Sequence, residues 1–167
     1  VQHRILSVFK WAVAEGLRAD NPATSDALAL PKHERQTKNS RALPYQEVVA
    51  AIDKVKASRA WSATKMALEF TILTAARSGE VRGACWSEID VENAVWTVPA
   101  QRMKMNREHR VPLSKRAMDV LEEARTLDGN TGLVFPSFSG RELSDNTLSK
   151  LLRELELGTT VHGFRSS

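Results

Sequence analysis

Hydrophobic residues recur with the spacing of an α-helix along most of the chain, and clusters of polar turn residues interrupt them. In residues 1–17 the apolar positions fall on one face, and Gly16 offers a C-terminal stop. The same spacing returns four times, so we expect further helices at residues 44–55, 61–76, 114–127 and 144–157.

Residues suited to helix ends flank these segments. Pro44 fits a helix start, and Ser114 and Ser144 fit N-cap positions. Asp128-Gly129 and Gly158 follow the last two helical patterns and predict their ends. The faces expected to be buried are Val48, Val49, Ile52 and Val55 in one helix and Ala117, Val120, Leu121 and Ala124 in another.

The stretch between residues 77 and 114 has a different pattern. A short helical turn is followed by two runs typical of strands, AVWTVP at 94–99 and RVPL at 110–113, with a long basic turn between them. The predicted fold is therefore mainly α with a small antiparallel β-hairpin or sheet, an α+β arrangement. Residues 160–167 have the pattern of the first turns of one more helix.

A polar and basic segment separates the first helix from the rest. Its composition is typical of a linker, so we expect a helical unit at 1–30, a linker at 31–43 and a larger domain at 44–167. The alternative is a long loop inside one domain, although unstructured loops of that length are uncommon in compact domains.

Composition narrows the classes of function. The 167 residues have a formal charge of +4 and a pI of about 9.5, which favours anionic partners such as nucleic acid but also fits an ordinary basic protein. Cys85 is the single cysteine, so an internal disulfide and a multi-cysteine zinc site are excluded, and a reducing cytoplasm fits. The four histidines form no i, i+4 pair, and no apolar run approaches the roughly 20 residues of a membrane span. We expect no metal site and no membrane role.

Arg77 follows a largely apolar helix directly. Its guanidinium would therefore emerge at a helix end, where it could bind a phosphate through two hydrogen bonds. The alternative is an ion pair with Glu80, which is the commoner fate of such an arginine.

Lys104 lies in QRMKMNREHR, the basic turn expected between the two strands. An ammonium group at a hairpin tip could reach a DNA groove or protonate a leaving group, and a solvated turn is the alternative. His162 and Arg165 are three residues apart, so on a helix they would share one face and could bind one phosphate, although such a spacing is also common by chance.

Taken in order, LTAARSGEVRGACWSEID, VWTVPAQRMKMNREHRVPLS, VFPS and LSKLLRELELGTTVHGFRSS resemble the catalytic domain of the tyrosine recombinases. The likeness is greatest to phage-type integrases of satellite phages and genomic islands. It also covers residues 1–30, which resemble the last helix of the core-type DNA-binding domain, with the NPA at 21–23 leading into the linker.

The resemblance implies roles for the basic residues. Arg77 matches the first catalytic arginine, Lys104 the hairpin lysine that acts as general acid, and His162 and Arg165 the H-x-x-R pair, with Glu80 in a supporting position. It implies double-stranded DNA at attachment sites as the partner, a tetramer on DNA for the parent enzyme, and no metal or nucleotide cofactor. DNA contacts are expected from Arg41, Arg102, Arg107 and Arg110.

The chain departs from the family pattern at its end. The family places its tyrosine nucleophile beyond the H-x-x-R pair, whereas here the only tyrosine is Tyr45, which we interpret as structural. We therefore expect a truncated catalytic domain that is monomeric and inactive alone. The alternatives are a non-catalytic DNA-binding module or the remnant of a decayed integrase.

Overall fold

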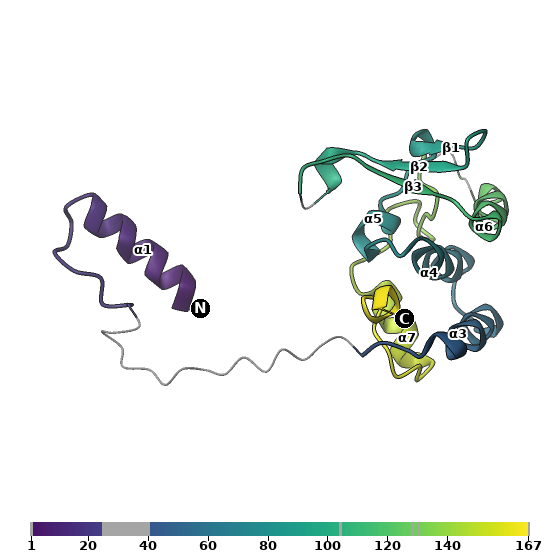
Figure 1. Cartoon of the computed structure of the whole chain (residues 1–167), viewed down its shortest axis with the longest axis horizontal. Coiled ribbons are helices and arrows are strands. Elements are labelled where there is room, and N and C mark those ends of the chain that lie inside the picture. The colour runs from purple at the N-terminus through teal and green to yellow at the C-terminus, as the bar shows by residue number, and fades with distance from the viewer. Residues whose placement is uncertain (1, 25–40, 104, 128, 130, 167) are drawn as a thin grey trace. The chain divides into compact units, whose positions relative to one another are not determined.

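The computed structural model describes every residue except 1, 25–40, 104, 128, 130 and 167. The chain divides into two compact units, Val1–Lys38 and Asn39–Ser167 (Figure 1). Most of the linker expected at 31–43 lies outside the described residues, so its boundaries stay a prediction.

The first unit contains helix α1, Gln2–Ala14. The chain leaves the helix at Gly16, whose φ of 71° is a conformation that glycine adopts without strain. The side chain of Asn21 then ties the following turn to the helix, because its Nδ2 donates to the Leu6 carbonyl at 3.2 Å. Val8 and Trp11 remain largely exposed on this unit.

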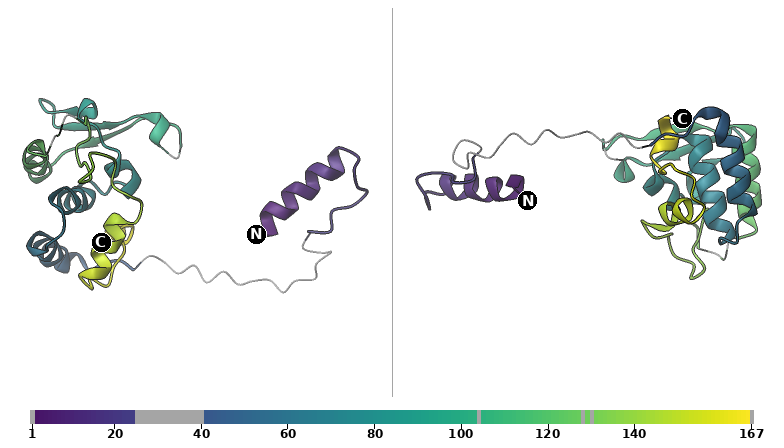
Figure 2. Two further views of the ribbon diagram at one scale, coloured as in Figure 1. Left: turned by 180° about the vertical axis from the view of Figure 1, so that it is seen from behind. Right: turned by 90° about the horizontal axis from the view of Figure 1, so that it is seen from below.

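Five helices of the second unit surround one core. Helix α4 is central and contacts each of the other four helices (Figures 1 and 2). Most of its side chains are buried, including those of the polar residues Thr64, Glu69 and Thr71. The helices are α3 (Tyr45–Ala57), α4 (Ser62–Thr74), α5 (Ser78–Arg82), α6 (Lys115–Arg125) and α7 (Thr147–Glu154).

A three-stranded antiparallel sheet covers one end of this helical core. Strands β2, Val95–Val98, and β3, His109–Pro112, pair as the predicted hairpin, and Trp96 lies opposite Val111. The sequence predicted two strands, and that number was wrong, because β1, Ile89–Asp90, adds a third at the edge. The fold class of helices with a small antiparallel sheet is confirmed.

The core lies between the sheet and the helices. Trp96 of β2 is fully buried against Phe70 of α4, with their ring centroids 5.4 Å apart, and the ring of Phe135 also contacts Phe70, at 5.5 Å. The four α6 residues expected to face inward are all buried, so that prediction is confirmed.

Two predicted helix details need correction. Ser114 caps α6 as expected, since its Oγ accepts from Ala117 N at 3.2 Å, but Ser144 does not cap α7, which begins at Thr147. The Ser144 hydroxyl bonds instead to the Thr147 hydroxyl at 2.8 Å. Val49 was expected on the buried face of α3 but is 67% exposed, because the buried residues of this helix are Ala51 and Val55.

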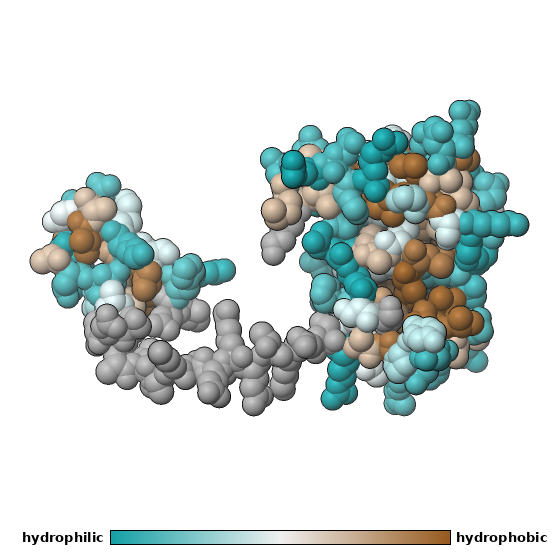
Figure 3. Space-filling view, viewed as in Figure 1, coloured by the Kyte–Doolittle hydropathy of each residue, from teal (hydrophilic) through white to brown (hydrophobic). Residues whose placement is uncertain are grey.

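Hydrophilic residues predominate on the hairpin and on the α5 side of the face seen in Figure 3, where Met105 is an exposed exception, whereas apolar residues lie between α3, α4 and α7. Among the helices that the structure describes, none has the length and apolar character needed to cross a membrane.

Candidate functional site

Arg77 lies at the start of α5, immediately after the buried helix α4. The chain turns at Ala75, which has a left-handed φ of 49°, and Arg77 takes an extended conformation as the N-cap residue. This sharp exit brings the arginine out of the core, and 45% of its side chain is exposed.

Glu80 fixes the orientation of Arg77. Its buried carboxylate accepts the backbone N–H of Arg77 at 2.9 Å through Oε2 and the Arg77 Nη1 at 2.6 Å through Oε1. The ion pair considered from the sequence therefore exists, but it occupies one edge of the guanidinium. A guanidinium carries five N–H donors, so others remain for an anion from solvent.

His162 and Arg165 lie in a short C-terminal turn, with the 3-10 helix η3 at Gly163–Ser166. Val161 and Phe164 are buried in the core and anchor the turn, while the two basic side chains point away from it and are exposed. Within the part of the chain that the structure describes, neither side chain has a hydrogen-bond or ion-pair partner. Both are therefore available to an external anion.

Arg41 anchors the same turn through its backbone. Its carbonyl accepts the Thr159 hydroxyl at 2.7 Å, and the chain approaches so closely that a Cβ at Gly163 would lie 2.0 Å from this oxygen. Only glycine fits there. The side chain of Arg41 is exposed beside the turn that carries His162.

The hairpin contributes exposed cations of its own. Arg107 and Arg110 are exposed, and neither guanidinium has a hydrogen-bond or ion-pair partner among the described residues. Lys104 lies outside the described residues. Arg102, expected to face DNA, is turned inward instead, where it donates to the Glu80 carbonyl at 2.9 Å and pairs with Glu88.

Sequence reasoning missed the inward turn of Arg102 and the close approach at Gly163. Both join residues far apart in the chain, and no spacing rule reports such pairs.

The elements that carry the exposed basic residues described above lie on one side of the domain. In Figures 1 and 2, α5, the tip of the β2–β3 hairpin and η3 are all on the side opposite α3 and α6. Tyr45, in contrast, begins α3 and is 72% exposed there. The fold thus brings three segments with basic residues to a common side.

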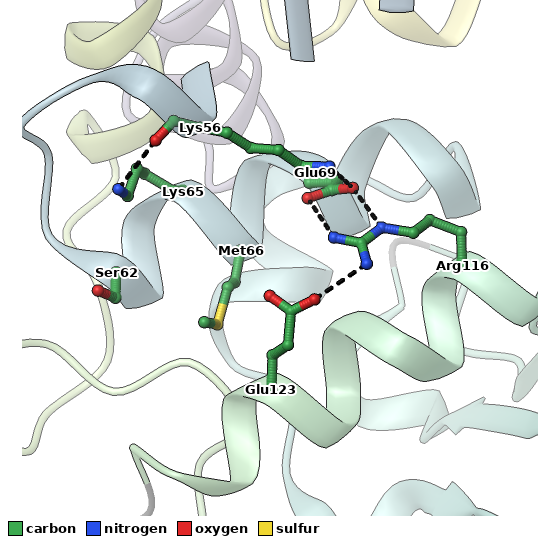
Figure 4. A pocket seen from close by; sticks show the side chains of 7 residues that line it. All are labelled: Lys56, Ser62, Lys65, Met66, Glu69, Arg116 and Glu123. Atoms are coloured by element: carbon green, nitrogen blue, oxygen red, sulfur yellow. Dashed lines mark hydrogen bonds and ion pairs between the residues drawn. The ribbon is translucent and has the colours of Figure 1, made fainter. Parts of the chain in front are cut away.

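A separate pocket of about 400 Å³ lies between α3, α4 and α6 (Figure 4). Buried Glu69 accepts Arg116 Nε at 2.8 Å and Lys56 Nζ at 3.0 Å, and Arg116 also pairs with Glu123 at 2.9 Å. Because these charges neutralise one another, the pocket is a structural ion network. No group of side chains suited to a metal ion occurs among the described residues.

Comparison with known proteins gives consistent matches. The profile of the phage integrase family matches residues 41–167. The integrase of Enterobacteria phage P4 is 31% identical over 184 residues, which cover 99% of this chain and 42% of that protein. Prophage integrase IntZ of Escherichia coli is 33% identical over 171 residues and is likewise covered over 42% of its length. The chain spans less than half the length of these relatives.

Solved structures show the same fold. A lambda integrase dimer bound to a COC′ core site superposes with a TM-score of 0.74 at 20% identity, over 99% of this chain and 62% of that chain. The Tn1549 transposon integrase in complex with a circular intermediate DNA gives a TM-score of 0.76 at 12% identity, over 99% and 62% of the two chains.

Proposed function

The chain belongs to the phage integrase family, and we propose that it is part of a site-specific recombinase that integrates or excises a prophage or genomic island. The observation that carries this proposal is the set of exposed Arg77, His162 and Arg165 side chains, carried by segments on one side of the domain. Arg165, Arg107 and Arg110 have no ion-pair partner among the described residues, and an extended polyanion such as double-stranded DNA fits such a surface.

We assign each basic residue a step in DNA cleavage. A tyrosine oxygen attacks the scissile phosphorus, the bond to the 5′ oxygen breaks, and a 3′-phosphotyrosyl link forms. Arg77 and Arg165 stabilise the extra negative charge on the phosphorane, and His162 hydrogen-bonds one of its oxygens. Lys104 donates a proton to the departing 5′ oxygen. Rejoining reverses these steps, so no external energy source is needed.

Glu80 has a positioning role in this scheme. One of its contacts holds the backbone of Arg77 and the other holds the guanidinium, so the arginine is oriented before DNA arrives. Such preorganisation lowers the cost of arranging charge in the transition state.

The nucleophile is the part of the reaction that this chain does not supply. Tyr45 is the only tyrosine, and it is the first residue of α3, a helix that lies on the other side of the domain from α5 and the hairpin tip. We infer that the attacking tyrosine belongs to residues outside this chain, and that the chain alone binds DNA as a monomer without cutting it. The complete enzyme would act as a tetramer on two attachment sites.

DNA backbone contacts extend the site along the duplex. Arg107 and Arg110 on the hairpin and Arg41 beside the C-terminal turn are exposed and suited to phosphate contacts, which position a protein on DNA without reading its sequence. Arg102 is assigned a different role because its guanidinium is already bound within the domain.

The experiment that tests this function uses the full-length protein that contains these residues and a nicked attachment-site duplex. We expect a covalent complex in which mass spectrometry locates a tyrosine on the 3′ phosphate, while the 167-residue chain binds the same duplex and forms none. DNA binding by both proteins without any covalent product would contradict the proposal and favour a non-catalytic DNA-binding module or a decayed integrase.

A further inference from the structure

Arg102 is held by groups from two separate elements. Its Nη1 donates to the backbone carbonyl of Glu80 in α5 at 2.9 Å, and its Nη2 pairs with the carboxylate of Glu88. The side chain is 26% exposed, and its Nε is buried without a partner in the described part of the chain. An arginine so enclosed contributes to the fold of the domain and not to its outer surface.

The end of α5 is shaped to receive this guanidinium. A Cβ at Gly83 would lie 2.7 Å from Arg102 Nη1, so any larger residue at this C-cap position would displace it. The last carbonyls of a helix lack intrahelical partners and carry partial negative charge. Arg102 satisfies one of them, on Glu80.

Glu88 provides a fixed anchor for the other edge of the guanidinium. Its Oε2 also accepts the indole N–H of the fully buried Trp96 at 3.0 Å and the backbone N–H of Cys85 at 3.4 Å. A carboxylate with three donors in a part-buried setting has little freedom to move. Arg102 is therefore fastened to the core and to α5 at the same time.

This arrangement connects two of the proposed site residues. The side chain of Glu80 binds Arg77, while its backbone carbonyl binds Arg102 at the start of the connection between β2 and β3. Arg102 ends the 3-10 helix η2, Ala100–Arg102, and Lys104 follows two residues later in the sequence. One buried glutamate thus links the first arginine to the segment that carries the lysine.

We propose that Arg102 is a positioning residue that fixes the start of the connection between β2 and β3 on α5, so that Lys104 and Arg77 act on the same scissile phosphate. This inference rests on the proposed function, in which Lys104 protonates the leaving 5′ oxygen. Loss of Arg102 would leave the Arg77–Glu80 contacts in place, while the β2–β3 connection that leads to Lys104 loses this attachment to α5.

Arg82 supplies a matched control. It lies on the same short helix, its side chain is 11% exposed, and its Nε is also buried without a partner among the described residues. It donates to the Leu143 carbonyl at 2.6 Å and pairs with Glu142 and Asp145, all outside the hairpin. Its loss would remove contacts made by α5 without releasing the connection between β2 and β3.

The test compares two leaving groups in the full-length protein. One nicked duplex carries the normal 5′ oxygen at the scissile phosphate, and the other carries sulfur there. A thiolate departs without a donated proton because thiols are far more acidic than alcohols. We expect Arg102→Met to slow cleavage of the oxygen substrate about 10- to 100-fold and the sulfur substrate less than about threefold. Lys104→Ala should show the same rescue, and Arg82→Met should slow both substrates equally.

The outcomes separate the two proposals. Rescue of Lys104→Ala but not of Arg102→Met would overturn the positioning role and leave the proposed function intact. Equal slowing of Lys104→Ala on both substrates would overturn the assigned role of Lys104, and the inference with it.

A second measurement needs no catalysis. Arg102→Lys, which retains one charge near Glu88 but not the two-sided contact, should raise amide hydrogen exchange in residues 100–108 of this chain at least about tenfold, with the amides of α4 unchanged. Unchanged exchange in the hairpin would overturn the inference.

Discussion

The carboxylate of Glu80 binds Arg77 at two points, accepting its backbone N–H at 2.9 Å and its guanidinium at 2.6 Å. In Glu80→Gln one carboxylate oxygen becomes an NH₂ donor that faces another donor. We expect single-turnover cleavage by the full-length protein to fall about 10- to 100-fold, with DNA affinity changed less than about threefold. Gel-shift titration of the same preparations measures the affinity, and a parallel loss of both would indicate misfolding instead.

The hairpin arginines should set the salt dependence of DNA binding. The DNA-binding constant falls as salt concentration rises. Removing one cation that neutralises a phosphate makes the slope of this fall, on logarithmic axes, less steep by about 0.9. Arg107→Ala and Arg110→Ala in this chain should each reduce the slope by about that amount. Arg59→Ala serves as the control, because this exposed arginine lies in the turn between α3 and α4. A slope that none of the three variants changes would exclude the hairpin from the DNA surface.

Gly163 should tolerate no side chain. Its added Cβ would lie 2.0 Å from the Arg41 carbonyl oxygen, so Gly163→Ala must push the turn that holds His162 and Arg165 away from the Arg41 segment. We expect a loss of about 2 to 4 kcal/mol in unfolding free energy, measured by urea titration. Gly79→Ala is the matched control, since its Cβ would meet only Arg82 Nη2 at 3.7 Å, and its stability should be unchanged or higher. Equal stabilities of the two variants would refute this packing.

The Glu69 network should govern stability in acid. Burial alone would raise the pKa of Glu69, but hydrogen bonds from Arg116 and Lys56 outweigh it and hold the pKa below its usual 4.5. The pairing therefore stabilises the fold above about pH 4.5 and is lost as the pH falls through the lowered pKa of the folded state. Glu69→Gln should be less stable at pH 7 and lose less stability between pH 6 and pH 3, as urea titrations would show. If the unfolding free energies of Glu69→Gln and of the unchanged chain fell in parallel between pH 6 and pH 3, the lowered pKa of Glu69 would be contradicted.

Local patterns predicted the helices and the hairpin because periodicity and capping act over a few residues. The Ser114 cap and the inward face of α6 are of this kind. Strand β1 escaped notice because two residues carry no alternation, and it exists only by pairing with β2. Ser144 does not cap α7, because its hydroxyl is hydrogen-bonded to the hydroxyl of Thr147.

The site was predictable only in part. The Arg77–Glu80 pair follows from a three-residue spacing at a helix start, which a sequence displays. The inward turn of Arg102 and the approach of Arg41 to Gly163 depend on contacts across 22 and more than 100 residues, so only the folded chain reveals them. The fate of a basic residue thus depends on which carboxylates the fold brings near it.

The most direct measurement is the amount of covalent protein–DNA complex that the full-length protein forms on a nicked attachment-site substrate when Arg77 or Arg165 is replaced by alanine. We expect either variant to bind the duplex with nearly unchanged affinity and to form no detectable complex, a loss of at least about 100-fold. Near wild-type complex formation by either variant would contradict the assignment of these arginines to the scissile phosphate.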